Sequence, residues 1–229
     1  MAQREEIGTG LLGPEARLDL LDGARLPTGR HGLPREVIVE NQRARLMGAM
    51  VEVVSTHGFP IAVVERIASR AGVSRRTFYE QFSGREEAFH RTYDAEAGRL
   101  FDDAVRAAAG ARDLAEAVGK GLGAVLGGLA RDPAVAKLLI VEVLIVGPEA
   151  LERRDAHMQR FAVLLEDAAI TFLGAPLPRL TAEGLVGAIY DVIYKRVLAG
   201  ETEDLEELRD DLLAFCLMQL RPSTDPGVG

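Results

Sequence analysis

Cysteine, tryptophan and long apolar runs are scarce or missing in this sequence. It has one cysteine, Cys216, no tryptophan, and only 5% aromatic residues. A single cysteine excludes a disulfide framework within the chain and is typical of the reducing cytoplasm. No apolar run reaches the roughly 20 residues of a transmembrane helix, and the longest, residues 138–146, is interrupted by Glu142. The N-terminus also lacks the apolar core of a signal peptide, so we expect a cytoplasmic protein without a membrane segment.

Residue patterns typical of catalytic and metal sites are also missing. Gly119-Lys120-Gly121 lacks both the earlier glycine and the following hydroxyl of a phosphate-binding loop. Cys216 has no evident base partner. No metal-ligand spacing relates the four histidines, which are His31, His57, His90 and His157. We therefore expect no catalytic residue, no metal site and no cofactor, and we do not expect an enzyme.

Alanine and leucine are abundant, with 48% hydrophobic and 27% charged residues overall. This composition suits helices that pack on helices. Glycines and prolines divide the chain into segments with apolar residues at helical spacing. We expect an all-α fold with helices at about residues 35–57, 64–71, 75–82, 85–109, 113–129, 133–146, 148–173, 181–199 and 203–220.

The net charge of −8 is divided unevenly along the 229 residues. Residues 25–85 contain ten arginines and five acidic residues, whereas residues 101–229 contain 13 basic and 21 acidic residues. This distribution is expected if only the N-terminal half contacts phosphate. The acidic half should repel DNA outside that contact.

Residues 63–85 have the pattern of a helix-turn-helix. Val64, Ile67, Ala68 and Ala71 form one apolar helical face, and Gly72 follows where the backbone leaves that helix. Ser74 is a suitable N-cap for the helix at 75–82. Phe78 and Phe82 would anchor this second helix, and its polar, cationic side would face the DNA major groove.

The segment AGVSRRTFYEQFSGREEAF resembles the signature of TetR-family transcriptional repressors, which reads roughly I-A-x-x-A-G-V-S-x-x-T-[FL]-Y-x-H-F-x-[SN]-K-E. The resemblance covers about residues 43–93, and a stretch similar to residues 26–33 precedes the first helix in some actinobacterial members of the family. It implies an N-terminal three-helix helix-turn-helix domain, followed by a C-terminal helical ligand-binding and dimerisation domain.

The second helix of the motif supplies most of the candidate DNA contacts. Arg75 and Arg76 can make bidentate contacts to guanine or pair with phosphate. The resemblance implies that Thr77 and Tyr79 hold the DNA backbone, while Gln81 replaces a common histidine and can still bond phosphate or adenine. The full set of candidate DNA-binding residues is Arg30, Arg43, Ser74, Arg75, Arg76, Thr77, Tyr79, Gln81 and Arg85.

Two of these candidates lie outside that helix on the N-terminal side. Arg43 is near the start of the helix at 35–57, where the family often approaches phosphate; simple solvation is the alternative. Arg30 belongs to a basic, glycine-rich stretch at 25–32 that could reach into a minor groove. A solvated tail is the alternative for that stretch.

The two ends of the motif differ in how well they match the TetR-family pattern. Ser83 to Glu86 fits a capping box, and Arg85 stands where the family usually has lysine, so we expect a phosphate site at the start of the helix at 85–109. Val63 replaces the threonine that usually caps the first helix of the motif. This substitution removes one expected phosphate contact.

The C-terminal half contains candidate packing and ligand-binding features. Gly119, Gly123 and Gly127 recur on one helix face, which indicates close helix packing or a soft wall beside a cavity. Polar residues also occur among apolar neighbours, as in a small-molecule site, although ordinary core packing is the alternative. The candidate ligand-binding residues are Glu142, His157, Phe161, Tyr190 and Tyr194.

The last two predicted helices each carry an apolar stripe. Two such helices can pair with their copies as a four-helix dimer interface, which the resemblance also implies. A dimer also places two reading helices on a palindrome. The stripes contain Leu185, Ile189, Val192, Ile193 and Val197 on one helix, and Leu205, Leu208, Leu212, Phe215 and Leu220 on the other.

These observations predict a flexible arm at 1–33, a DNA-binding domain at 34–92 and a ligand-binding and dimerisation domain at 93–221. The expected function is a homodimeric repressor that a small hydrophobic ligand releases from palindromic double-stranded operator DNA. An activator fits the same residues. The alternative is a helical ligand- or protein-binding module whose helix-turn-helix no longer reads sequence.

Overall fold

The computed structural model describes residues 34–220, and every regular element in that range is helical. The all-α fold predicted from the sequence is therefore confirmed for this part of the chain. Arg30 and the arm at 1–33 lie outside the described residues. Between residues 34 and 220, no helix is long and apolar enough to cross a membrane.

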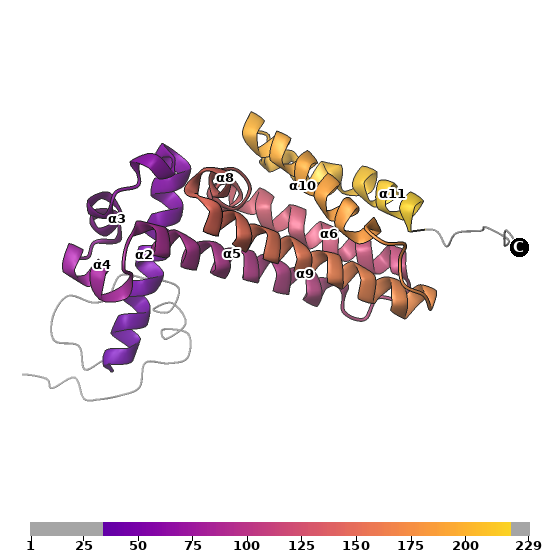
Figure 1. Ribbon diagram of the computed structural model, residues 1–229, viewed down its shortest axis with the longest axis horizontal. Helices are drawn as coiled ribbons and strands as arrows, with labels where there is room; N and C mark the ends of the chain where they lie inside the picture. The colour runs from indigo at the N-terminus through magenta and orange to yellow at the C-terminus, as the bar shows by residue number, and fades with distance from the viewer. Residues whose placement is uncertain (1–33, 221–229) are drawn as a thin grey trace, which may run out of the picture.

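The first three α-helices form one end of the molecule (Figure 1). They pack around a buried set of apolar side chains that includes Met50, Ile67, Phe78 and Phe89, each 0% exposed. α2 lies across the other two helices, and the short η1 connects it to α3. The bounds are α2 Arg35–His57, η1 Phe59–Ile61, α3 Val64–Ala71 and α4 Arg75–Gln81.

The turn between α3 and α4 has the predicted geometry. Gly72 ends α3 with φ 65° and ψ 38°, a left-handed conformation that favours glycine. Ser74 caps α4, because its Oγ accepts a hydrogen bond from the Thr77 N–H at 3.0 Å. Both features that the sequence indicated for this turn are therefore confirmed.

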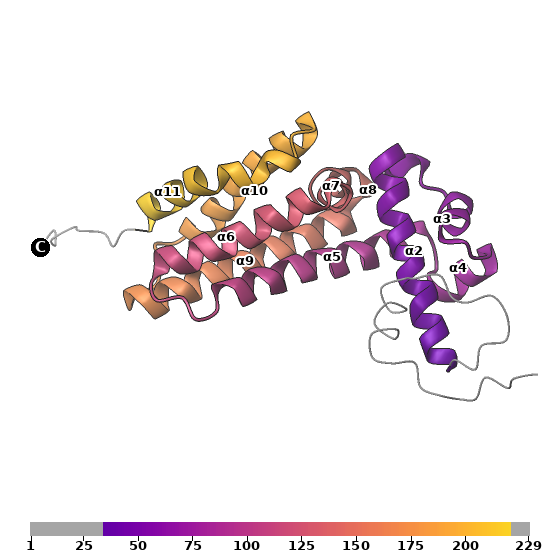
Figure 2. The ribbon, with the colours of Figure 1, turned by 180° about the vertical axis from the view of Figure 1, so that it is seen from behind.

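A long helix joins this end to the rest of the molecule. α5 begins beside the first three helices and continues along α6 and α9, while α10 and α11 cover the opposite side of those two helices (Figures 1 and 2). One hydrophobic core runs without interruption from Leu46 in α2 to Leu212 in α11. The bounds are α5 Arg85–Ala108, α6 Leu114–Arg131, α9 Pro148–Leu173, α10 Thr181–Ala199, η3 Glu203–Leu208 and α11 Arg209–Gln219.

The segment predicted as one helix at 133–146 is interrupted by a wider turn. It consists of α7 (Pro133–Lys137), the π-helix η2 (Leu138–Glu142) and α8 (Val143–Val146). Within η2 the Ile140 carbonyl accepts a hydrogen bond from the Tyr190 hydroxyl at 2.8 Å. A carbonyl with a partner outside its own helix is free to leave the regular α-helical ladder.

The predicted capping box at the start of α5 is wrong. The N-cap is Gly84, which makes no side-chain cap bond. The N–H and the hydroxyl of Ser83 both donate to Oε2 of Glu87, each at 2.7 Å. A capping box with Ser83 as the N-cap would place Glu86 third in the helix. The N-cap is one residue later, so Glu87 is third, and its carboxylate binds Ser83 on the far side of Gly84.

The glycine face of α6 packs closely against the end of the chain. A Cβ added to Gly119 would lie 3.2 Å from Cδ2 of Leu213, and one added to Gly127 would lie 3.0 Å from Oε1 of Glu206. These glycines therefore let η3 and α11 approach α6. This result favours the close-packing interpretation of the glycine spacing.

The apolar stripes that the sequence suggested for dimer pairing are used mainly inside the chain. Their most deeply buried members are Leu185, Ile193, Val197, Leu205, Leu212 and Leu220, each 7% exposed or less. They pack α10 and α11 onto α6, α9 and η2, so any partner must use another face. Large apolar residues that remain exposed include Leu198 at 60% and Met218 at 59%.

Two glycine substitutions test the role of close packing. Gly98→Ala in α5 adds a methyl group with nothing within 4 Å, so it should raise the free energy of unfolding by up to about 1 kcal/mol through helix propensity. Gly119→Leu should lower it by about 1–3 kcal/mol, because overpacking against Leu213 outweighs that gain. Urea unfolding at fixed protein concentration compares them, and shifts in the same direction would contradict the packing model.

Candidate DNA-reading surface and ligand cavity

α4 combines a buried anchor with an exposed polar face. Phe78 is 0% exposed and Phe82 is 3% exposed, and their rings lie 5.6 Å apart. On the other face the side chain of Arg76 is 88% exposed, and Tyr79 is 52% exposed. A short helix held in this way can enter a major groove without losing its place in the core.

The two arginines of this face are engaged in surface ion pairs. Nε of Arg76 lies 2.9 Å from Oε1 of Glu80, and Nη1 of Arg75 lies 2.8 Å from Oε1 of Glu65. Exposed ion pairs contribute only about 0–1 kcal/mol. A phosphate or a guanine edge can therefore replace either carboxylate at small cost.

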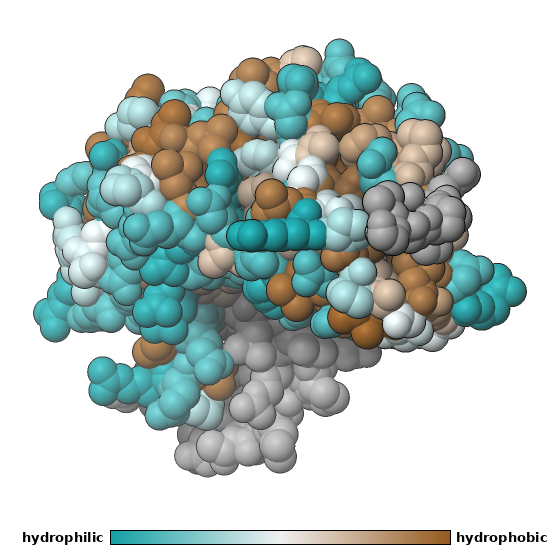
Figure 3. Space-filling model, turned by 45° about the vertical axis from the view of Figure 1, so that its right-hand side comes forward, coloured by the Kyte–Doolittle hydropathy of each residue, from teal (hydrophilic) through white to brown (hydrophobic). Residues whose placement is uncertain are grey.

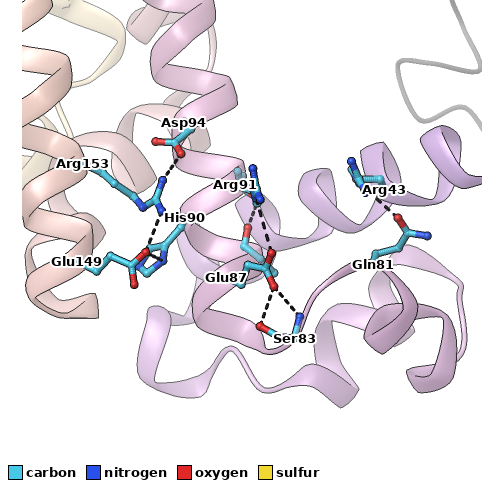
Figure 4. A network of polar contacts seen from close by, with 11 residues as sticks. Arg43, Gln81, Ser83, Glu87, His90, Arg91, Asp94, Glu149 and Arg153 are labelled. Carbon is cyan, nitrogen blue, oxygen red and sulfur yellow. Dashed lines mark hydrogen bonds and ion pairs between the residues drawn. The ribbon is translucent and has the colours of Figure 1, made fainter.

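The remaining predicted contacts from α2 and α4 lie near this face. Nε of Arg43 donates to Oε1 of Gln81 at 3.3 Å, which joins α2 to α4 (Figure 4). Thr77 is half-buried, and its Oγ1 lies 2.9 Å from Oγ of Ser74. The structure thus brings Arg43 and Gln81 together, while Ser74 and Thr77 support the start of α4.

The start of α5 fits the predicted phosphate site less well. The guanidinium of Arg85 lies 4.7 Å from the centre of the Phe59 ring, and its Nη1 donates to the Pro60 carbonyl at 3.3 Å. The first turn also carries the carboxylates of Glu86 and Glu87. The Ser83 N–H, and then its hydroxyl, hold the pKa of Glu87 below its usual value, so this end is anionic at neutral pH.

A cavity of about 210 Å³ opens within the C-terminal helices. It lies between α5, α6, α9 and α10, with η2 at one end, and its lining is almost entirely apolar. Three predicted ligand-binding residues, His157, Phe161 and Tyr190, line it. A mostly apolar cavity with few polar groups is typical of a small-molecule site.

The other two predicted ligand-binding residues do not line this cavity. Tyr194 packs against the core beside it. Glu142 points away from it toward the DNA-binding end, where its Oε2 accepts the Phe59 N–H at 2.9 Å. The structure therefore places both residues outside the lining of this cavity.

The cavity also contains polar residues that the sequence reasoning missed. Tyr93 and Arg154 line it, and the Arg154 guanidinium lies 5.4 Å from the centre of the Tyr190 ring. Arg154 precedes His157 by three residues and Phe161 by seven, which places all three on one helix face. This spacing is a signal that could have identified Arg154 from the sequence.

The comparisons with known proteins agree with this geometry. Residues 46–92 match the family model described as bacterial regulatory proteins, tetR family. Over these residues the helix-turn-helix is therefore similar to that family. The comparison with curated proteins gave no match.

Solved structures of bacterial regulators share the fold over most of this chain. The fatty acid degradation regulator FadR from Bacillus halodurans aligns with a TM-score of 0.71 at 22% identity, over 79% of this chain and 96% of that one. FadR from Bacillus subtilis in complex with stearoyl-CoA gives 0.68 at 17% identity, over 77% and 98%. A TetR-like regulator from Rhodococcus sp. RHA1 gives 0.63 at 21% identity, over 81% and 98%.

The departure from the TetR pattern at Val63 has a structural consequence. Val63 is the N-cap of α3 and makes no side-chain cap bond. It is 44% exposed, so α3 begins with an apolar side chain at the surface. The structure therefore confirms that α3 has no side-chain N-cap, as the sequence indicated.

A polar network connects the cavity wall to α5. Nε2 of His157 lies 3.4 Å from Oδ1 of Asp94, and Arg153 bridges Asp94 and Glu149 (Figure 4). His90 on α5 also meets Glu149, with Nδ1 3.3 Å from Oε1. This network ties α9 to the half of α5 nearest the DNA-binding end.

Burial governs the ionisation of the groups around the cavity. It lowers the pKa of His157 despite the nearby Asp94, and it raises the pKa of Tyr93, Tyr190 and Cys216. These four side chains are therefore neutral at pH 7. Among residues 34–220, no group of three or more histidine, cysteine or acidic residues could hold a metal ion.

The lowered pKa of His157 predicts a pH dependence of stability. Its ordinary value is 6.5, so below that pH the unfolded chain binds a proton that the folded chain does not. The free energy of unfolding should fall as the pH falls from about 7 to about 5. His157→Gln should flatten this slope in urea titrations, whereas His57→Gln, at an exposed position, should not; equal slopes in all three proteins would contradict the assignment.

Proposed function

We propose that this protein is a homodimeric, sequence-specific DNA-binding regulator of transcription, and that a hydrophobic small molecule releases it from its operator. The observation that carries the proposal is α4, an arginine-bearing helix anchored by Phe78 and Phe82 within the segment that matches the TetR family model. Repression is the simplest outcome of occupying an operator. Such a role belongs in the cytoplasm, where the DNA lies.

We keep the predicted division of the chain as part of this proposal. Residues 34–92 form the DNA-reading unit, residues 93–221 form the ligand-binding and dimerisation unit, and residues 1–33 form an arm that carries Arg30. α5 belongs to both units, because it begins in the first and lines the cavity of the second. It is therefore the element through which the two can influence each other.

Dimerisation through the last two helices rests on the faces that the fold leaves open. Gly184, Gly187, Asp191, Lys195 and Leu198 follow one another at helical spacing on the outer side of α10. An added Cβ at Gly184 or Gly187 would meet nothing within 4 Å, so a partner helix can approach closely. Figure 3 shows hydrophobic residues grouped along the upper edge of the molecule, where α10 and α11 lie.

The ligand that fits the cavity is a hydrophobic molecule with an acidic end. The apolar lining suits a hydrocarbon body, and Arg154 can bind a carboxylate after exchanging its present partner. That partner is Asp155, whose Oδ1 lies 2.6 Å from Nη2 of Arg154 and whose side chain is 63% exposed. The complex of Bacillus subtilis FadR with stearoyl-CoA supports an acyl chain as the body.

The alternative function is a helical interaction module whose helix-turn-helix no longer reads sequence. Val63 favours this alternative, because it gives α3 no side-chain cap and cannot donate a hydrogen bond to a phosphate. Selection of genomic fragments with the purified protein, followed by titration at two salt concentrations, separates the two. A palindrome bound far more tightly than random duplex supports the regulator, whereas weak, steeply salt-dependent and sequence-independent binding supports the module.

The base-reading assignment predicts the effect of Arg76→Ala on the selected palindrome. Loss of a bidentate base contact should lower specific affinity by about 5- to 150-fold, or about 1–3 kcal/mol, and relax sequence preference at one position. Arg106→Ala is the matched control, because Arg106 is also exposed and paired with an acidic residue in its own helix. Equal affinities of the two variants would contradict the assignment.

The ligand assignment predicts a charge-dependent effect of Arg154→Gln. Dodecanoate should bind the variant about tenfold more weakly or worse, because hydrogen bonds to charged groups contribute about 1.5–3 kcal/mol. Dodecanol should bind both proteins alike. Arg160→Gln, on the same helix but over the Phe101 ring at 4.0 Å, serves as the control in calorimetric titrations; equal losses for acid and alcohol would show that Arg154 does not bind the head group.

A further inference from the structure

η2 carries a buried carboxylate that contacts the DNA-binding end. Glu142, its last residue, is 6% exposed. Its Oε2 accepts the backbone N–H of Phe59 at 2.9 Å, across 83 residues of sequence. A carboxyl group taken out of water needs hydrogen-bond partners, and the Phe59 N–H supplies one of them from the other end of the molecule.

Phe59 is held in the core of the DNA-binding end by contacts on several sides. It begins η1, which leads from α2 into α3, and it is 4% exposed. Its ring meets the Phe89 ring edge to face at 5.2 Å, with the Arg85 guanidinium above it. Whatever holds the backbone of Phe59 therefore sets how α3 and α4 sit against α5.

A second contact from the same segment reinforces the attachment. Nζ of Lys137, the residue before η2, donates to the Ser55 carbonyl at 2.7 Å. Ser55 lies in the last turn of α2, four residues before Phe59. The segment that contains η2 thus holds the end of α2 and the start of η1 together.

The other side of η2 lines the ligand cavity. Leu139 and Ile140 contribute to its wall, and so does Tyr190. The hydroxyl of Tyr190 donates to the Ile140 carbonyl at 2.8 Å, two residues before Glu142. One π-helical turn therefore has a cavity-lining partner on one side and a partner in the DNA-binding end on the other.

A π-helical turn suits a role in transmission. It contains one residue more than the α-helical path would need, and such turns occur frequently at functional sites. Its backbone can change register or tilt without unfolding the flanking helices. In this chain η2 accepts two outside hydrogen bonds, one from the Tyr190 hydroxyl and one from the Phe59 N–H, and these bonds fix its present geometry.

We propose that η2 is the coupling element between the cavity and the DNA-reading surface, and that Glu142 is its positioning residue. A ligand that displaces the Tyr190 hydroxyl from Ile140 frees η2, the Glu142 carboxylate leaves the Phe59 N–H, and η1 no longer holds α3 and α4 in the DNA-binding position. This mechanism rests on the proposed function, because it describes how the same cavity regulates the same surface.

Three substitutions in the full-length protein test this without a ligand. Tyr190→Phe removes only the hydroxyl and keeps the ring beneath Arg154. Glu142→Leu removes the acceptor at similar size, and Glu142→Gln keeps an acceptor oxygen. Tyr194→Phe, one helical turn further along α10 and outside the cavity lining, is the control.

Two measurements are made on each variant: affinity for the selected palindrome and hydrogen exchange of the Phe59 amide. Tyr190→Phe and Glu142→Leu should each lower affinity by about 5-fold or more and speed exchange at Phe59. The double variant should be no weaker than the more severe single variant, since both act along one path. Glu142→Gln and Tyr194→Phe should stay close to the unmodified protein.

The proposal is overturned if Tyr190→Phe leaves both measurements unchanged, or if the two effects simply add. If Glu142→Leu fails to fold, hydrogen exchange of the Phe59 amide in Tyr190→Phe still tests the proposal. If the unmodified protein binds no specific DNA, the proposed function fails. The exchange measurement then still shows whether the Tyr190 hydroxyl and η1 are linked.

Discussion

The burial of Phe89 on α5 is the constraint on which the arrangement of the molecule depends. Its ring, 0% exposed, meets Phe59 on one side and stacks near Tyr93 on the other, with ring centres 5.2 Å and 6.4 Å away. Phe59 belongs to the connection into α3, whereas Tyr93 lines the cavity. Because buried aromatic side chains dominate core energetics, this row fixes the reading helices and the cavity wall to one helix. A change in the tilt of α5 must therefore move both the connection into α3 and the wall of the cavity.

Electrostatics complements this packing. The cationic face of α4 uses weak surface pairs that DNA can replace, whereas the network of Asp94, Arg153, Glu149 and His90 ties α5 to α9. The first kind of pair leaves arginines available for a partner. The second kind resists separation of two helices that the cavity lies between. The arginines on α4 are therefore available to bind DNA, whereas the charged residues of α5 and α9 stabilise the packing of these two helices.

Local patterns made the helix-turn-helix predictable, and non-local contacts limited the rest. Gly72, Ser74 and Phe78 act through conformational preference, capping and helical spacing, which a sequence displays directly. The helix start at Arg85 was predicted correctly, but its N-cap was placed one residue too early, because Ser83 and Gly84 are both acceptable N-caps and Glu86 and Glu87 are adjacent. The role of Glu142 depends on a backbone N–H 83 residues away, and no spacing rule reports such a contact. The cavity was only partly foreseen, because leucine, valine and alanine line cavities and cores alike.

The size of the cavity gives a reason why ligand binding should alter the shape of this protein. At about 210 Å³, it is smaller than the roughly 300–1,000 Å³ of typical ligand pockets, so a ligand larger than the cavity would displace part of the lining. Protein interiors are close-packed and do not absorb such a displacement gradually. The helical walls around the cavity are regular along α5, α6, α9 and α10, whereas η2 is a π-helical turn held by the Tyr190 hydroxyl and the Phe59 N–H. Breaking one or two hydrogen bonds there costs far less than bending a packed helix. Expansion of the cavity should therefore begin at η2, which also contacts the DNA-binding end through Glu142.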